Sequence, residues 1–121
     1  MVDIKGDLGA LVIGLGADGV TPLGNGRDGV TIEAGGDGSV IGGTASGEGN
    51  VIAGHLFNGI TVGNTVAAAR ISGNSIYTND GIGIDLVPTG FGYGVTANDP
   101  LDIDTGGNGL QNFPEIDSAG G

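Results

Sequence analysis

A five-residue pattern recurs along this chain and restricts its fold more than any other feature. Asn or Asp, then Gly, an aliphatic residue, a small residue and a second aliphatic residue occur at 28–32, 58–62 and 80–84. The three copies begin 30 and then 22 residues apart. Internal repeats with periods of about 20–50 residues are typical of folds in which each repeat is stable only when stacked on its neighbours. We therefore expect a stack of repeats.

Two further patterns recur between the copies of the first. Residues 39–43 resemble residues 69–73, which lie 30 positions later, and residues 49–52 resemble residues 73–76, which lie 24 positions later. Each segment is short, contains β-branched side chains and is bounded by turn-forming residues, which predicts strands. Three strands in a fixed order form one coil, and an extra loop at 44–49 explains why one coil is longer than the next.

The alternation of side chains in these strands predicts the interior. Side chains two positions apart in a strand point to the same face. The aliphatic positions of the three pentapeptides therefore predict a stacked apolar column of Val30, Ile32, Ile60, Val62, Ile82 and Ile84. Asn50 and Asn74 stand at matching corners, where we expect their side chains to stack and share hydrogen bonds, as Asn ladders do in other stacked sheets.

Composition agrees with such a fold and excludes several functions. Glycine supplies 29 of the 121 residues, which suits a chain with many sharp corners. The net charge of -11, with three basic residues, excludes a nucleic-acid-binding surface. No apolar run approaches the roughly 18 residues of a membrane span. Cysteine is absent, which excludes disulfides and thiolate metal sites.

The predicted fold is all-β, a parallel β-helix of about four coils, each of roughly 22–30 residues. An antiparallel sandwich is the rival, because Asx-Gly pairs also form hairpin turns. In a hairpin the pair stands between two strands, whereas here it opens the same strand three times. That position favours the β-helix.

The order of these short motifs is similar to a known family. They resemble the right-handed parallel β-helix repeats of large bacterial and archaeal surface proteins at 13–26, 28–30, 41–44, 49–52, 71–76 and 81–86. Residues 95–99, 102–106 and 110–114 are similar to the segment that often closes such a β-helix. The likeness spans about residues 10–117. It implies right-handed coils over 1–90 and a Gly- and Asp-rich closing segment over 91–121 that packs on the same domain.

The resemblance also implies an extracellular or cell-surface stalk, adhesin or coat module, of a kind that is usually non-catalytic. Residues 1–16 are too short and too acidic for a signal peptide. A short stack leaves strand edges at both ends, and unpaired edges pair readily with other chains. We therefore expect a homo-oligomer or filament formed end to end. The alternative is a carbohydrate-binding or polysaccharide-cleaving β-helix module, with a glycan as partner.

The acidic tail is the best candidate for a metal site. Five side chains that carry oxygen lie within eleven residues, namely Asn98, Asp99, Asp102, Asp104 and Asn108. Calcium takes about six to eight oxygen ligands, and a cation relieves the repulsion between neighbouring carboxylates. An EF-hand frame from Asp104 fails because its third position is Gly106. The sequence predicts Ca²⁺ in another geometry, or else a turn-rich loop whose side chains cap their own backbone.

His55 is the only histidine of the chain. Zinc sites and catalytic triads need further ligands or partners, and neither cysteine nor a second histidine is present to supply them. The sequence therefore predicts a surface residue in a turn.

Overall fold

The computed structural model describes residues 2–4 and 7–88. In this part of the chain there is no helix, and every regular element is a short strand. All strand pairs are parallel. The strands are β1 (Val2–Ile4), β2 (Asp7–Leu8), β3 (Val12–Ile13), β4 (Val30–Ile32), β5 (Ser39–Gly42), β6 (Val51–Ala53), β7 (Ile60–Val62), β8 (Ala69–Ser72), β9 (Ser75–Tyr77) and β10 (Ile84–Leu86).

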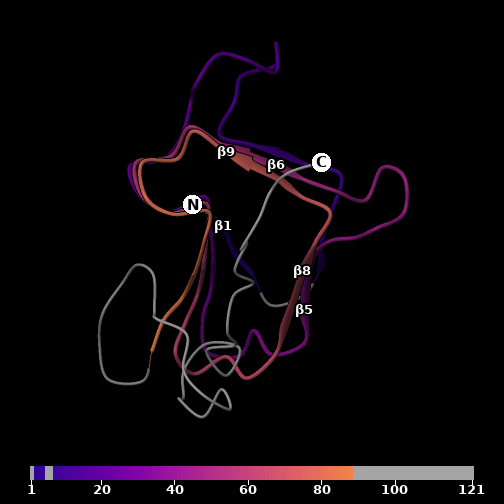
Figure 1. Ribbon diagram of the computed structural model, residues 1–121, viewed down its shortest axis with the longest axis vertical. Coiled ribbons are helices and arrows are strands. Elements are labelled where there is room, and N and C mark those ends of the chain that lie inside the picture. The colour runs from indigo at the N-terminus through magenta and orange to yellow at the C-terminus, as the bar shows by residue number, and fades with distance from the viewer. Residues whose placement is uncertain (1, 5–6, 89–121) are drawn as a thin grey trace, which may run out of the picture.

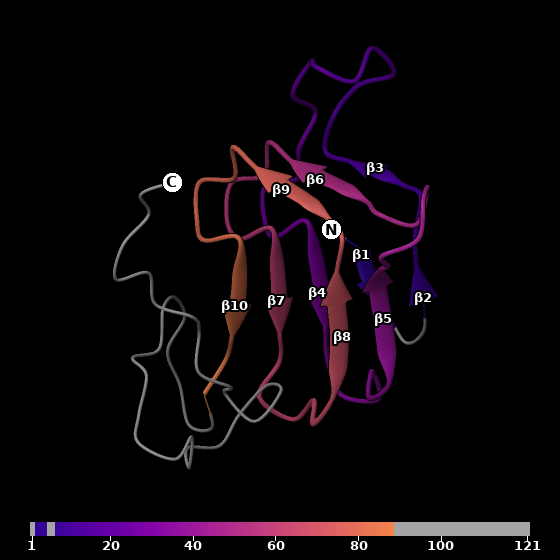
Figure 2. The ribbon, with the colours of Figure 1, turned by 45° about the vertical axis from the view of Figure 1, so that its right-hand side comes forward.

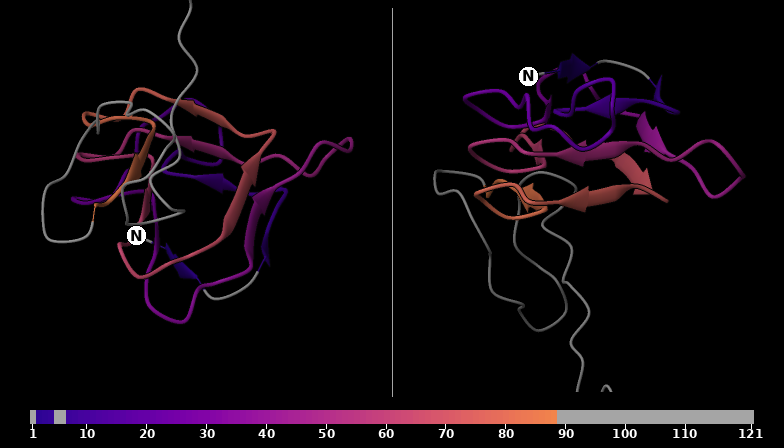
Figure 3. Two further views of the ribbon diagram at one scale, coloured as in Figure 1. Left: turned by 60° about the horizontal axis from the view of Figure 1, so that its bottom comes forward. Right: turned by 90° about the horizontal axis from the view of Figure 1, so that it is seen from above.

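Three parallel sheets take these strands in rotation. Sheet A has the order β1-β4-β7-β10, sheet B has β2-β5-β8, and sheet C has β3-β6-β9. The chain thus visits A, B and C in turn, and each new strand pairs with the strand laid down one passage earlier. We call one passage through the three sheets a circuit. Figure 1 looks down the stack, so that strands of one sheet overlap, and the right-hand view of Figure 3 shows the circuits as layers.

The strand register confirms most of the repeats. Val30 to Ile32 pair in order with Ile60 to Val62. Ser39 to Gly42 pair with Ala69 to Ser72, and Val51 to Ala53 pair with Ser75 to Tyr77. The sequence therefore predicted all three strand-to-strand alignments between the second and third circuits.

The predicted alignment of the third pentapeptide is wrong by two residues. Ile84 pairs with Ile60 and Leu86 pairs with Val62, whereas Ile82 lies before strand β10. The Ile82 N–H donates to Asn58 Oδ1 at 3.0 Å, just as the Asn58 N–H donates to Asp28 Oδ1 at 3.0 Å. Ile82 therefore takes the place that Asp28 and Asn58 hold in earlier circuits, and the step is 24 residues.

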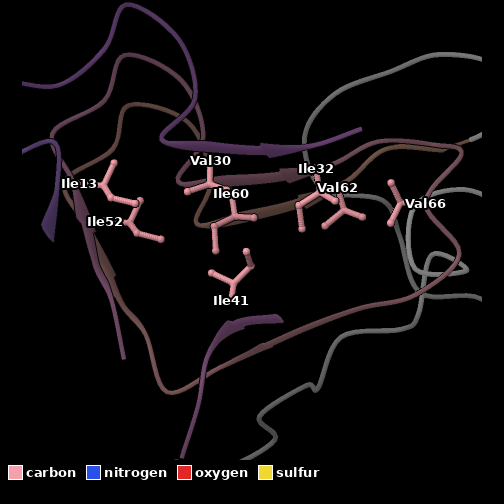
Figure 4. Packing of buried hydrophobic residues seen from close by; sticks show 8 residues of the cluster. All are labelled: Ile13, Val30, Ile32, Ile41, Ile52, Ile60, Val62 and Val66. Atoms are coloured by element: carbon pink, nitrogen blue, oxygen red, sulfur yellow. The ribbon is translucent and has the colours of Figure 1, made fainter. Parts of the chain in front are cut away.

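The apolar core lies between the three sheets (Figure 4). Side chains of sheets A, B and C point toward one another there, and most of them have no exposed surface. Leu8, Ala69, Ile71, Ile76 and Leu86 pack against this cluster from partly buried positions. The buried cluster is Ile13, Val30, Ile32, Ile41, Ile52, Ile60, Val62 and Val66.

Of the predicted column, Val30, Ile32, Ile60 and Val62 belong to the buried cluster. Ile82 is half-buried outside the strands, and the Ile84 side chain on the last described strand of sheet A is 42% exposed. Burying the aliphatic positions of circuit after circuit is what stabilises such a stack, because one circuit alone cannot cover its own apolar face.

Two loops project from the stack where a circuit is longer than its neighbour. Residues 14–24 form one of them, in which Leu15 and Pro22 make an isolated antiparallel bridge (top of Figure 2). The other spans residues 43–49, which include the loop predicted at 44–49, and is the magenta loop in Figure 3. Among the described residues no helix is long and apolar enough to cross a membrane.

Candidate functional site

Polar side chains gather at the corners of the circuits, where the chain leaves one sheet for the next. At the corner between sheets B and C, Asn74 Oδ1 accepts the backbone N–H of Asn50 at 3.0 Å and the Asn50 Nδ2–H at 2.9 Å. Asn74 Nδ2 donates to the Ile41 carbonyl at 2.9 Å. We call this position the amide corner. The predicted sharing of hydrogen bonds between Asn50 and Asn74 is confirmed.

Asn50 repeats the same contacts one circuit earlier. Its Oδ1 accepts the Leu11 N–H at 3.0 Å, and its Nδ2 donates to the Leu8 carbonyl at 3.0 Å. Each amide thus satisfies one backbone donor and one backbone acceptor of the preceding circuit, groups that the chain cannot pair within a strand because it is turning. The Asn50 side chain is 1% exposed, so leaving its own polar atoms without partners would be costly.

The corner between sheets C and A is built by the same rule with a different side chain. Asn79 Oδ1 accepts the His55 N–H at 3.0 Å, and Asn79 Nδ2 donates to the Ile52 carbonyl at 3.2 Å. One circuit earlier the His55 side chain stands in the equivalent position. Its Nδ1 contacts the Asn25 N–H at 3.1 Å, and its Nε2 contacts the Ile13 carbonyl at 3.2 Å. We call this position the imidazole corner.

The prediction that His55 is a surface residue is wrong. Its side chain is 1% exposed and stands in the middle of the stack. The two ring nitrogens do the work of an Asn amide, Nδ1 in place of Oδ1 and Nε2 in place of Nδ2. Burial lowers the pKa of His55, and the hydrogen bond to the Ile13 carbonyl partly opposes this effect.

Glycine makes both corners possible. Gly14 and Gly42 have φ angles of +96° and +87°, a region that other residues rarely adopt. A Cβ on Gly14 would lie 2.5 Å from His55 Nε2, and one on Gly42 would lie 2.4 Å from Asn74 Oδ1. The missing side chain leaves the space that the imidazole or amide fills.

A third polar column runs along sheet A, with buried hydroxyl, amide and carboxylate groups. Asn58 Nδ2 donates to Thr61 Oγ1 at 3.0 Å and to Asp85 Oδ2 at 3.1 Å. Thr61 and Asp85 are register partners in neighbouring strands. Asp85 has no exposed surface. The column therefore ties the third circuit to β10 through side chains as well as backbone.

The predicted calcium ligands Asn98, Asp99, Asp102, Asp104 and Asn108 lie outside the described residues. Within residues 2–4 and 7–88, no group of three or more His, Cys, Asp and Glu side chains is placed to hold a metal ion. The calcium site stays a prediction for the tail.

Comparison with known proteins gives no match: no family model fits the chain, and no curated protein or solved structure is similar to it. The functional argument therefore rests on the geometry of its own residues.

Proposed function

We propose that this chain is a right-handed parallel β-solenoid that serves as a non-catalytic structural or adhesive module at the cell surface. The observation that carries the proposal is the stack of corner side chains. Each buried polar group at the amide and imidazole corners is directed at the circuit before it. Polar chemistry in the described part of the molecule is therefore used to hold circuits together.

The negative charge of the protein is consistent with a module exposed at the cell surface. A net charge of -11 keeps individual chains soluble and favours cations over nucleic acid or anionic lipid as partners. We propose that the tail residues named above bind Ca²⁺, which would lower repulsion among the carboxylates there. A thermal melt with and without chelator tests this part, since calcium bound only to the native protein raises the midpoint. An unchanged midpoint would remove the site.

Self-association is the second element of the proposal. The strands β1, β2 and β3 each pair on one side only among the described residues, which gives one end of the stack a row of strand edges. Edges of this kind recruit further strands unless they are covered or charged. End-to-end contacts that do not close by rotation would produce a filament.

The test is sedimentation of the full chain over a range of concentrations, with electron microscopy of the same samples. We expect the mass to rise with concentration and threads or closed oligomers to appear. Val12→Lys, at a 54% exposed position of the edge strand β3, should reduce association. Val20→Lys, at a 73% exposed position of the projecting loop, is the matched control and should leave it unchanged.

Monodisperse monomers at high concentration would refute self-association. Binding to one class of glycan, together with loss of polysaccharide viscosity, would instead favour the carbohydrate-directed alternative.

A further inference from the structure

The hydrogen-bond partners of His55 leave its imidazole no choice of protonation state. The Asn25 backbone N–H can only donate, so Nδ1 must carry a lone pair. The Ile13 carbonyl can only accept, so Nε2 must carry the hydrogen. The folded imidazole corner therefore requires the neutral ring in its Nε2–H form. Asn50, in the equivalent middle position of the amide corner, makes the same two bonds with a group that does not titrate near neutral pH.

We propose that His55 is an acid-sensitive latch between the first and second circuits, which opens when a proton on Nδ1 confronts the Asn25 N–H. Two N–H groups then point at each other beside an imidazole that is 1% exposed, and the hydrogen bond between Nδ1 and the half-buried Asn25 is lost. The segment released is the one that the latch holds, residues 13–25, which include the projecting loop. This inference goes beyond the proposed function, because it concerns when the stack holds together and not what the stack does.

Few charges surround the ring. From the segment before β4, the carboxylate of Asp28 favours the protonated form. The other groups seen against the ring carry no charge: the Asn25 N–H, the Ile13 carbonyl, and the backbones of Gly14 and Gly29. Burial is the largest influence and lowers the His55 pKa below its ordinary value of about 6.5.

The sign of the pH effect follows from this direction. Between the lowered pKa of the folded state and about 6.5, the unfolded chain binds a proton that the folded chain does not. The contribution of neutral His55 to the free energy of unfolding is therefore fully present above about pH 6.5, and it is lost as the pH falls through that window. One proton difference changes the ratio of folded to unfolded protein by about tenfold for each pH unit.

The first experiment is NMR of the imidazole nitrogens, which belong to the single histidine and need no assignment by mutation. We expect the Nε2–H form near pH 8 and a titration midpoint below 6.5. An Nδ1–H form, or a midpoint at or above 6.5, would overturn the proposal. This measurement uses the wild-type chain, so it decides the question even if a variant fails to fold.

The second experiment compares the wild type with His55→Asn. This variant places at the imidazole corner the same side chain that Asn50 supplies at the amide corner, and that side chain does not titrate. Denaturant unfolding and hydrogen exchange at the Asn25 N–H are measured for both at pH 8, 6 and 5. Carboxylates titrate alike in the two proteins, so their effects cancel in the comparison. We expect the wild type to lose stability relative to His55→Asn, by up to about tenfold for each pH unit below 6.5. Equal pH dependence in both proteins would contradict the latch.

Discussion

The amide corner and the imidazole corner solve one problem with two side chains. We call the stacked polar side chains of one corner a ladder and each of these side chains a rung. In both ladders the rung in the middle of the stack, Asn50 or His55, is 1% exposed and pairs with one N–H and one carbonyl of the circuit before it. At the amide corner Asn50 does this with a carboxamide, and at the imidazole corner His55 does it with a ring. The geometry is shared, but only the ring gains a proton in mild acid. The comparison teaches that hydrogen-bond pattern, and not residue type, defines a rung.

The largest effect is expected from filling the space that either ladder occupies. Gly14→Ala would bring a Cβ to 1.9 Å from the Ala53 carbonyl oxygen, and Gly42→Ala would bring one to 2.2 Å from that of Ser72. Both also force a left-handed φ on Ala. We expect each to cost about 4 kcal/mol or more of unfolding free energy, measured by denaturant titration. Gly19→Ala is the control, since it has a φ of +75° but nothing within 4 Å. A similar loss in all three variants would show that φ and not the ladder is responsible.

The next largest effect is expected at Asn50, where two variants distinguish the role of Oδ1 from that of Nδ2. Asn50→Ala leaves the part-buried Leu11 N–H and Leu8 carbonyl without their partner, and should cost about 2 kcal/mol. Asn50→Asp keeps the acceptor for Leu11 but sets a carboxylate oxygen against the Leu8 carbonyl and Asn74 Oδ1. Its loss should therefore grow as the pH rises above the carboxyl pKa, where Asn50→Ala shows no such trend. Equal curves for the two variants would mean that Nδ2 contributes nothing.

Removing the side chain of Asn74 or Asn79 should reduce the free energy of unfolding less than removing that of Asn50. Asn74 and Asn79 are only half-buried, so water can replace part of what their side chains supply. Asn74→Ala and Asn79→Ala should each cost about 1 kcal/mol, by the same denaturant titration. If either cost as much as Asn50→Ala, exposure would not set the strength of a rung.

The smallest effect belongs to the exposed loop inserted at the imidazole corner. Asp18 accepts hydrogen bonds from the Thr21 hydroxyl, the Thr21 N–H and the Val20 N–H, which lower its pKa to about 2. Thr21→Val should raise this pKa toward the ordinary Asp value, as followed by carboxyl NMR. Because Asp18 is exposed, the unfolding midpoint near pH 7 should not change measurably. A Thr21→Val variant with an unshifted Asp18 would show that the backbone bonds alone suffice.

Local pattern is enough to predict the strands β4 to β9 and the hydrogen bonds between Asn50 and Asn74. The alternation around Val30 and Ile60 marks strands whose interior side chains are now seen buried. The Asn50 and Asn74 pair was found because the same residue type recurs 24 positions apart. The neighbouring pair of His55 and Asn79 has the same spacing but was missed, since the two side chains share a hydrogen-bond geometry and not a name.

The register of β10 was missed for a related reason. Asp80-Gly81 copies the residues that open β4 and β7, so the sequence aligned it with them. The register is set instead by the corner hydrogen bonds, which pair Asn74 and Asn79 with residues 24 positions earlier in the chain. Holding that spacing puts Ile82 against Asn58. The hydrogen bonds between circuits outweigh the local turn preference of Asp80-Gly81, and a short motif does not reveal that competition.

The spacing of 24 residues recurs at three places in the last circuit, from Asn50 to Asn74, from His55 to Asn79 and from Asn58 to Ile82. A stretch of that length therefore carries its own strand for each sheet and its own rung for each corner. Duplicating it in the gene would lengthen the protein by one layer without requiring any new kind of contact. Growth and shortening by whole layers is thus a change that this architecture accepts in a single genetic step.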